Sequence, residues 1–546
     1  MSGKQLTIIG VACALVLATV AQAETSTQVA LERLVGQLRV DGHLEISASQ
    51  VAAVEFIPVV YERRDYIPAW VLDASVDAVL EAIRNSYEHG LDPEDYHWQA
   101  INELRSRVAT GAGSQAAAEM EILLTDAVVR LAYHANFGKV LPGELDPNWN
   151  FDRRLHSPDP VSELGDVLGM TDVTSVIRER TNAPVFYHWL REALARYREI
   201  AAGGGWPSIP SGPTLKPGMT SERIVPLRQR LQRTDDLADA QTGDSENFDA
   251  ALKQAVTAFQ KRHGLAPDGT VGPVTLAALN IPVEQRIDQI RVNLERIRWV
   301  YKELPEDYII VDIAGFHVYL MQEDEIVWQA RAQVGRPYRD TPVFRDSVRY
   351  LEFNPTWTVP QTILREDILP RLKRDPGYLD ERNMQVLTFS RKPVDASTID
   401  WHSVSADHFP YLLRQEPGPD NALGRVKFMF PNAHAIYIHD TPSKSLFARS
   451  ERAFSSGCIR VERPFELAEL LLDDPERWDQ QGIQQLLDSR LTQRVNLKEP
   501  LPVLILYWTA EADADGRVHF RRDVYDRDAP VLEALEGEFR LVVPDA

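Results

Sequence analysis

Residues 435–461, AIYIHDTPSKSLFARSERAFSSGCIRV, decide how this chain is interpreted. Apolar and polar residues alternate over 435–440, which predicts a half-buried strand with Tyr437 and His439 on one face. A loop follows this strand and ends in Ser455-Ser456-Gly457-Cys458. The segment therefore combines a strand histidine with a cysteine at the end of a loop that can return to that strand.

Cys458 is expected to be the single thiol of the mature chain. The other cysteine, Cys13, lies in an apolar N-terminal segment that we expect to be removed, so no internal disulfide can form. A thiol attacks as its thiolate, and His439 would supply the base. Gly457 lets a substrate carbonyl approach the backbone N–H groups of Gly457 and Cys458, which would form an oxyanion hole. The combination suits acyl transfer. The alternative is a small buried cysteine and a structural histidine.

The spacing of these residues resembles a known signature. His439, a gap of fifteen residues and then SSGCIR over 455–460 is similar to the motif of the YkuD-type L,D-transpeptidases, cysteine enzymes of peptidoglycan cross-linking. Two positions depart from most members: Ser456 replaces a second histidine, and Arg460 stands where many have asparagine. Both departures match the YcbB-like branch of Gram-negative bacteria. The resemblance therefore supports the Cys458–His439 pair but no role for a second histidine.

The resemblance implies roles for individual residues. Cys458 would be the nucleophile, and His439 the base that later activates an incoming amine. In the family, a backbone carbonyl beside the histidine orients its ring, which implies this role for the main chain of Asp440; the Asp440 carboxylate is the alternative. Backbone N–H groups of Gly457 and Cys458 would stabilise the oxyanion. Substrate contacts are predicted at Tyr437, Arg460, Ser455, Ser456 and Trp357, with core packing as the alternative for Tyr437.

Positive charge gathers around the motif although the whole protein has a net charge of −21. Over 443–463 the basic residues are Lys444, Arg449, Arg452, Arg460 and Arg463, against Glu451 and Glu462. Arginine can bind a peptide carboxylate in bidentate fashion, so the excess favours an anionic substrate. Solvated surface charge is the alternative. The overall acidity argues against nucleic acid as a partner.

By resemblance, the donor is a tetrapeptide stem that loses its terminal D-alanine, and the product is a 3→3 cross-link. No metal or organic cofactor is required, and carbapenem-type β-lactams are expected to acylate the thiol. Other cell-wall synthesis enzymes are expected partners besides the peptidoglycan stems. The alternatives are a YkuD-type cysteine hydrolase, an L,D-carboxypeptidase or endopeptidase, and a non-catalytic wall-binding protein. A zinc peptidase that uses His434 and His439 is disfavoured, because the sequence contains no H-E-x-x-H or CxxC motif.

The N-terminus predicts export. Residues 1–23 combine Lys4, a short apolar run and an A-x-A-like site at 21–23, as a secretory signal does. We therefore expect the periplasm of a Gram-negative bacterium, with membrane contact only if this segment stays uncleaved. A single-pass anchor is the alternative, although the run is shorter than the ~20 residues of a span.

At 546 residues the chain predicts two to four domains and a multidomain α+β fold. Helical spacing dominates 24–200, and 61–70 with 90–96 resemble the helical scaffold domain of the YcbB-like branch. A Gly/Pro/Ser-rich linker is predicted over 201–214. Residues 215–282 resemble the small three-helix peptidoglycan-binding domain, which either binds glycan or acts as a spacer.

Residues 283–304 predict a connecting helix, and the apolar period changes to two after it. We assign 305–500 to the catalytic domain, with strands predicted over 308–313, 316–321 and 325–334. By resemblance this domain is β-sandwich-like, and 364–423 is an insertion that forms a lid or a structural flap. For 501–546 we predict a hairpin that pairs 503–506 with 517–525, followed by a tail.

Overall fold

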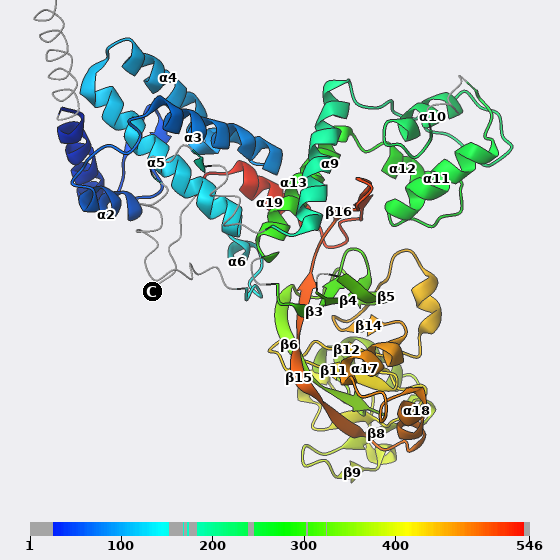
Figure 1. Ribbon diagram of the computed structural model, residues 1–546. Coiled ribbons are helices and arrows are strands. Elements are labelled where there is room, and N and C mark those ends of the chain that lie inside the picture. Colours follow the sequence, from blue (N-terminus) through cyan, green and yellow to red (C-terminus); the bar gives the residue numbers. More distant parts are fainter. Residues whose placement is uncertain are drawn as a thin grey trace, which may run out of the picture.

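The computed structural model describes residues 26–151, 168, 172–173, 183–238, 245–301, 304–323 and 325–539. Figure 1 shows a helical N-terminal region, a small helical domain and a sheet domain, so the predicted multidomain α+β organisation is confirmed. The predicted signal, 1–23, lies outside the described residues. Within the described part of the chain, no helix has the length and apolar character needed to cross a membrane.

The N-terminal region is built around one long helix, α5 (Gly113–Phe137), which is buried on most of its faces. Its consecutive apolar residues 122–124 and 127–129 explain this, because a helix that is apolar all round needs neighbours on every side. The surrounding elements are a helix over 26–41, β1 (Glu45–Ile46), β2 (Ser49–Gln50), α2 (Phe56–Arg63), α3 (Asp73–Ser86), η1 (Tyr87–His89), η2 (Pro93–Tyr96), α4 (Trp98–Ala109) and α6 (Pro142–Leu145).

Two long helices join this region to the rest of the molecule. The apolar stripe of α9 (Val185–Ala202) packs against α13 (Val283–Arg298), as the shared core of Leu190, Leu194, Ile290 and Leu294 shows. The predicted scaffold domain included α9, but this helix contributes to a core that also contains Phe520 near the C-terminus. Helix α13 is therefore the centre of the domain junction.

The small domain consists of α10 (Ile224–Gln232), α11 (Ala250–Arg262) and α12 (Pro273–Leu279) around its own apolar core. The side chain of Gln260 holds the turn over 268–272 through hydrogen bonds to three of its residues. Its side chain donates to Asp268 Oδ1 (2.9 Å) and the Thr270 carbonyl (2.9 Å), and accepts from the Gly269 N–H (2.8 Å). Gly269 has φ +70°, a conformation that favours glycine.

The sheet domain contains one mixed sheet of nine strands. They are β3 (Asp307–Asp312), β4 (His317–Gln322), β5 (Glu325–Gly335), β6 (Phe344–Phe353), β11 (Val426–Met429), β12 (Ile438–His439), β13 (Ala453–Ser455), β14 (Ile459–Val461) and β15 (Gln493–Leu506). The order is β13-β5-β14-β12-β11-β6-β15-β3-β4, and β4 also pairs with β5. The sheet thus closes on itself around one core, whereas the resemblance implied a β-sandwich-like arrangement. Helices α17 (Pro464–Leu472) and α18 (Gln480–Asp488) contribute Leu467 and Ile483 to that core.

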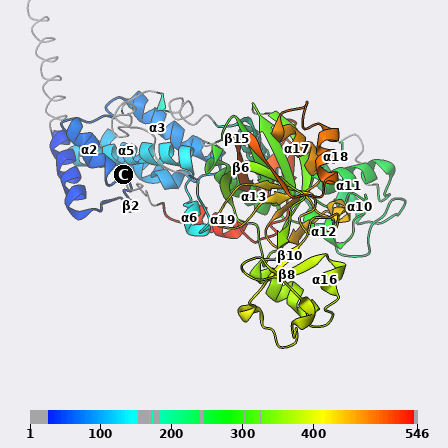
Figure 2. The same cartoon turned by 90° about the horizontal axis from the view of Figure 1, so that it is seen from below.

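Strands β6 and β11 pair in the sheet, but in the sequence they are separated by an inserted lobe. This lobe projects away from the sheet (Figure 2). It has its own apolar core and a sheet in the order β7-β10-β8-β9. Its elements are β7 (Trp357–Thr358), α14 (Gln361–Ile363), a π-helical turn η5 (Leu364–Ile368), α15 (Leu369–Leu372), α16 (Tyr378–Glu381), β8 (Met384–Leu387), β9 (Pro393–Val394), η6 (Ala396–Thr398), η7 (Ala406–His408) and β10 (Leu412–Gln415). The lobe includes most of the predicted insertion 364–423 and begins a few residues earlier.

The C-terminal hairpin differs from the predicted one. Val503–Leu506 is the end of β15, which lies between β3 and β6 in the large sheet. The hairpin is formed by β16 (Ala510–Ala512) and β17 (Val518–Phe520). The chain then returns toward the N-terminal region, where α19 (Asp528–Glu536) contributes Val531 and Leu535 to the scaffold core.

Candidate active site

Neighbouring strands bring the histidine and the cysteine together. Strand β12 runs parallel to β14, with Ile438 opposite Ile459 and His439 opposite Arg460. Cys458 directly precedes β14, and the Ile459 N–H donates to the Tyr437 carbonyl (3.1 Å). The predicted strand 435–440 is therefore shorter than expected, but it carries His439 into the centre of the sheet.

The thiol of Cys458 is half-buried and free. Burial raises its pKa, while hydrogen bonding to Tyr437 and the positive charges of Lys427 and Arg460 act in the opposite direction. The Sγ atom donates to the Ala435 carbonyl at 3.7 Å. Among the described residues, no hydrogen bond joins Sγ to His439. The resting thiol is therefore protonated at neutral pH.

His439 is almost completely buried, and its ring is fixed at one nitrogen. Nδ1 lies 2.5 Å from the carbonyl oxygen of Asp440. Burial, followed by the positive charge of Arg460, lowers the pKa of His439 to about 3, so the imidazole is neutral at neutral pH. A carbonyl only accepts, so Nδ1 carries the proton and Nε2 keeps its lone pair. The ring is therefore in the tautomer that can accept a proton at Nε2.

The Asp440 carboxylate is directed away from the imidazole. Its Oδ2 accepts the Arg425 N–H (2.9 Å), and Oδ1 forms an ion pair with Lys444. The main chain and the side chain of Asp440 therefore have different partners. The carbonyl accepts from His439, and the carboxylate binds Arg425 and Lys444.

Gly457 has φ +112°, which L side chains rarely adopt. A Cβ there would lie 3.0 Å from Ile436 Cδ1. The Gly457 N–H donates to Ser455 Oγ (3.2 Å), and its carbonyl accepts from Thr341 Oγ1 (2.7 Å). Among the described residues, the Cys458 N–H has no hydrogen-bond acceptor in the protein, so it is available to a ligand oxygen.

Comparisons with known proteins identify the domains. Residues 306–481 match the YkuD family, "L,D-transpeptidase catalytic domain". The chain carries a YkuD L,D-transpeptidase catalytic domain. Residues 55–194 match a "Scaffold domain", and 220–279 match a "Putative peptidoglycan binding domain". The suspected relationship to this family is thereby confirmed.

One curated relative is a Haemophilus influenzae protein named "Putative L,D-transpeptidase", 35% identical over 251 residues. The match covers 45% of this chain and 50% of that protein, so the chain spans about half the length of this relative. A solved L,D-transpeptidase of Xylanimonas cellulosilytica is 17% identical, with 54% and 98% of the two chains covered and a TM-score of 0.18. One from Mycobacterium smegmatis is 12% identical, with 37% and 58% covered and a TM-score of 0.18.

Beside the loop that carries Cys458 in the YkuD domain, Arg339 connects this loop to the inserted lobe. Its Nη1 donates to Ser456 Oγ (2.8 Å) and pairs with Asp367 (2.7 Å), and its Nη2 pairs with Glu366. Both acidic residues belong to the π-helical turn η5. Sequence reasoning missed Arg339, because nothing in its local sequence indicates a partner more than a hundred residues away.

Of the other predicted substrate contacts, Tyr437 lies beside His439, with ring centroids 5.6 Å apart. Lys427, also missed from the sequence, lies 4.0 Å above the Tyr437 ring. Arg460 is next to Cys458 and donates to Gln333 Oε1 at 3.2 Å. Trp357 lies apart from this group, in the sheet of the inserted lobe, where β7 pairs with β10.

Most of the basic side chains that the sequence suggested for binding an anionic substrate are already bonded to other protein groups. Lys444 pairs with Asp440, and Arg463 pairs with Glu466. Arg452 donates to the carbonyls of Ala332, Arg449 and Phe316. His434 contacts the ring of Phe344 at 4.8 Å. Within the described ranges, no group of three or more His, Cys, Asp or Glu side chains is arranged to hold a metal ion.

Proposed function

We propose that this protein is a peptidoglycan L,D-transpeptidase that forms 3→3 cross-links through a thioester on Cys458. The observation that carries the proposal is the arrangement on β12 and β14: a free thiol beside a neutral imidazole whose Nδ1 is held by the Asp440 carbonyl. The family match of residues 306–481 supports the same reaction class.

In the first half-reaction, His439 Nε2 takes the thiol proton and Cys458 Sγ attacks the diamino-acid carbonyl of a tetrapeptide stem. The negative charge that develops on the carbonyl oxygen is stabilised by the Cys458 N–H. The Gly457 N–H, which the sequence also predicted as a donor, is instead bonded to Ser455 Oγ. The bond to the terminal D-alanine breaks, and the departing nitrogen receives the proton from His439. A thioester remains on Cys458.

In the second half-reaction, the side-chain amine of another stem attacks the thioester. His439 takes a proton from the amine, the carbon–sulfur bond breaks, and the thiol is regenerated as the proton returns to sulfur. The product is the 3→3 cross-link. The neutral imidazole suits both halves, because an imidazolium could not accept a proton from either nucleophile.

For the donor stem, we propose contacts with Tyr437, Ser456 and Arg460 beside the nucleophile, and with Trp357 when the inserted lobe approaches as a lid. The buried Ser455 acts from behind the loop, through its hydrogen bond with the Gly457 N–H. Residues 1–23 would direct the enzyme to the periplasm of a Gram-negative bacterium, where its partners are peptidoglycan stems and other cell-wall synthesis enzymes.

The proposal is tested by mass spectrometry of the mature protein and its Cys458→Ala variant, each incubated with imipenem and with disaccharide-tetrapeptides. We expect a covalent imipenem adduct on the wild type only, and a cross-linked dimer product from the wild type only. The His439→Gln variant should lose both while remaining folded.

Two other outcomes would replace the proposal. Thiol-dependent release of D-alanine with tripeptide as the sole product would make the enzyme a cysteine hydrolase, in which water takes the place of the amine. A folded wild type that gives neither adduct nor product would instead be a non-catalytic wall-binding protein.

A further inference from the structure

The segment 523–528, which we call the tether, follows the C-terminal hairpin and lies outside the matched catalytic domain, 306–481. It nevertheless contacts two residues, Gly335 and Thr341, that lie next to the loop of Cys458. The Tyr525 hydroxyl donates to the Gly335 carbonyl (2.6 Å) and accepts the Thr341 N–H (3.2 Å). One phenol therefore joins the end of β5 to the segment that leads into β6.

Thr341 continues this connection to Gly457. Its Oγ1 accepts the Gly335 N–H (2.9 Å) and donates to the Gly457 carbonyl (2.7 Å). Thr341 is fully buried, so water cannot take over these bonds if they are lost. Tyr525 and Thr341 together form two hydrogen-bonded steps that end at the carbonyl beside Cys458.

The geometry of the peptide bond gives that carbonyl its importance. The Gly457 C=O and the Cys458 N–H belong to one planar trans peptide unit and point in opposite directions. Fixing the carbonyl therefore fixes the direction of the N–H, which is the group without a protein acceptor among the described residues. A rotation of this peptide would turn the N–H away from the developing oxyanion.

We propose that Tyr525 is a positioning residue, which orients the Cys458 N–H as an oxyanion-hole donor through Gly335, Thr341 and the Gly457 carbonyl. The inference rests on the proposed function, because that function gives the N–H its task. Burial raises the pKa of Tyr525 to about 12, so its hydroxyl keeps the proton that it donates.

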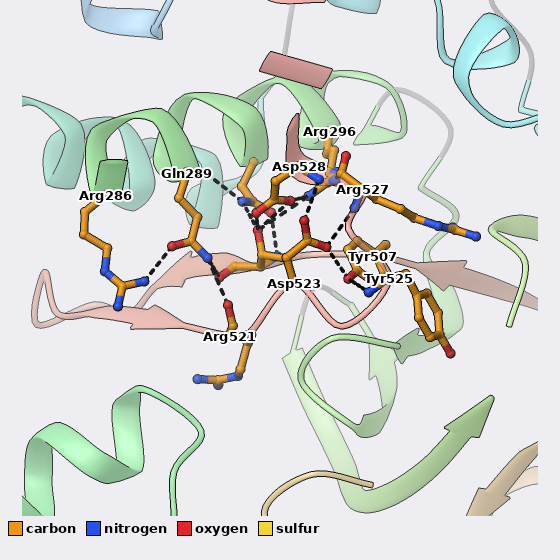
Figure 3. Close-up of polar contacts among 11 residues, drawn as sticks. Arg286, Gln289, Arg296, Tyr507, Arg521, Asp523, Tyr525, Arg527 and Asp528 are labelled. Carbon is orange, nitrogen blue, oxygen red and sulfur yellow. Dashed lines mark hydrogen bonds and ion pairs between the residues drawn. The ribbon is translucent and has the colours of Figure 1, made fainter. Parts of the chain in front are cut away.

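The tether is held in place by a network of hydrogen bonds around Asp523 and Tyr507. Asp523 accepts the N–H groups of Arg527 (2.9 Å) and Asp528 (2.8 Å) and the hydroxyl of Tyr507 (2.5 Å). The Tyr525 N–H in turn donates to Tyr507 Oη (2.9 Å), and the two rings stack 5.5 Å apart. Figure 3 shows this network beneath α13, with the Tyr525 side chain directed away from that helix.

The other end of the tether is anchored at the junction between the domains. Asp528 pairs with Arg296 of α13 at 2.5 Å. Arg527 pairs with Asp340, the neighbour of Thr341, at 2.5 Å and with Asp146 beside α6 at 3.4 Å. The scaffold region thus helps to hold the segment that supports the loop of Cys458, which gives the C-terminal segment a task in catalysis.

The test compares two reactions of the same thiol in the mature full-length chain. Imipenem acylation forms an oxyanion: sulfur adds to the lactam carbonyl, the ring C–N bond breaks, and the ring nitrogen takes the proton that left the thiol. Iodoacetamide alkylation displaces iodide from carbon without an oxyanion. Tyr525→Phe should slow acylation by about 10–100-fold, less than the loss of an oxyanion donor itself, and leave alkylation and its pH profile unchanged.

Tyr301→Phe is the matched control, because it also removes a buried hydroxyl that donates to a main-chain carbonyl, that of Ala135. It should cost similar stability without slowing acylation. If Tyr525→Phe does not fold, Thr341→Val and Thr341→Ser replace it: valine removes the hydroxyl and should slow acylation, whereas serine retains the hydroxyl and should restore it.

The outcomes separate the two proposals. If wild type is alkylated but never acylated, the proposed function fails. If wild type is acylated and folded Tyr525→Phe is acylated equally fast, the positioning role is wrong. A parallel loss of alkylation and acylation would also overturn it, because the effect would then be on the thiol and not on the oxyanion hole.

Discussion

The imidazole Nδ1 of His439 is bonded to the main-chain carbonyl of Asp440 and not to its carboxylate. The sequence allowed either the carbonyl or the carboxylate of Asp440 to orient the imidazole, and the conformation of Asp440 shows that the carbonyl is the group in contact. A carbonyl cannot be removed by substitution, so the orienting group is insensitive to the side chain at this position. The carboxylate instead stabilises the neighbouring loop through Arg425 and Lys444.

Asp440→Asn should therefore slow imipenem acylation by less than about tenfold, far less than the loss of a triad carboxylate. In triads where a carboxylate orients the histidine, the same change costs about 10⁴. His439→Gln is the reference variant for loss of the base. Stopped-flow acylation rates of the three proteins provide the comparison, and a triad-sized loss in Asp440→Asn would assign the orienting role to the carboxylate.

The pH dependence of thiol reactivity follows from the two shifted pKa values. Burial raises the pKa of Cys458 and lowers that of His439 to about 3. The resting pair is therefore thiol and neutral imidazole, and the thiolate forms only at alkaline pH. Iodoacetamide alkylation should rise continuously from pH 6 to pH 9, past the ~8.5 of an ordinary cysteine. A plateau already reached near pH 6 would indicate a thiolate–imidazolium pair and contradict this prediction.

The buried histidine also predicts a change in stability with pH. The pKa of His439 is about 3 in the folded chain against 6.5 for the free side chain. Between these values the unfolded state binds the extra proton, so the free energy of unfolding falls as pH falls below 6.5, and above 6.5 this site has no effect. Relative to His439→Gln, the wild type should lose about 2 kcal/mol between pH 6.5 and 5. Urea unfolding at several pH values measures the difference, and parallel curves would refute it.

Gly457 should not tolerate a side chain. Alanine would be held at φ +112°, with its Cβ 3.0 Å from Ile436 Cδ1. The backbone strain costs about 1–2 kcal/mol, and relief of it would turn the peptide that carries the Cys458 N–H. Gly457→Ala should lower the melting temperature and slow imipenem acylation. Gly516→Ala is the control, because Gly516 has φ +72° with nothing near its Cβ position. It should lose stability alone, and equal acylation by both variants would contradict the prediction.

The sequence predicted the parts of the structure that depend on local patterns. The alternation in β3, β4 and β5 and the helical spacing in α3 and α13 have periods of a few residues, so they are visible in the chain itself. The proximity of Cys458 and His439 could be predicted because the motif spans only twenty residues. Only a short loop separates the two residues in the sequence, so they could be predicted to lie close together.

Contacts between distant segments could not be predicted in this way. Thr341 and Gly457 are separated by 116 residues, and no local pattern specifies that hydrogen bond. Val503–Leu506 was assigned to a hairpin because a strand and a turn follow it closely. Its continuous apolar run, VLIL, was the available signal for the central strand that it forms, since such strands are buried on both faces.

Arg339 should control how the inserted lobe meets the loop that carries Cys458. Its side chain is only 9% exposed and contacts Glu366, Asp367 and Ser456 together. Arg339→Gln removes both ion pairs, so the turn η5 should open more often and exchange its amide hydrogens faster. We also expect slower imipenem acylation, because Ser456 loses its donor beside Cys458. Hydrogen exchange of peptides covering 361–372 provides the measurement.

Arg365→Gln is the matched control for this prediction. Arg365 pairs with the same Glu366 at 3.1 Å, but its side chain is 52% exposed. Exposed pairs contribute about 0–1 kcal/mol, so this variant should change neither exchange nor acylation. If Arg339→Gln exchanges like the wild type while acylation falls, Arg339 acts through Ser456 alone. If exchange rises and acylation is unchanged, the lobe moves independently of the loop that carries Cys458. Either result would break the connection that the ion pairs and the Ser456 hydrogen bond imply.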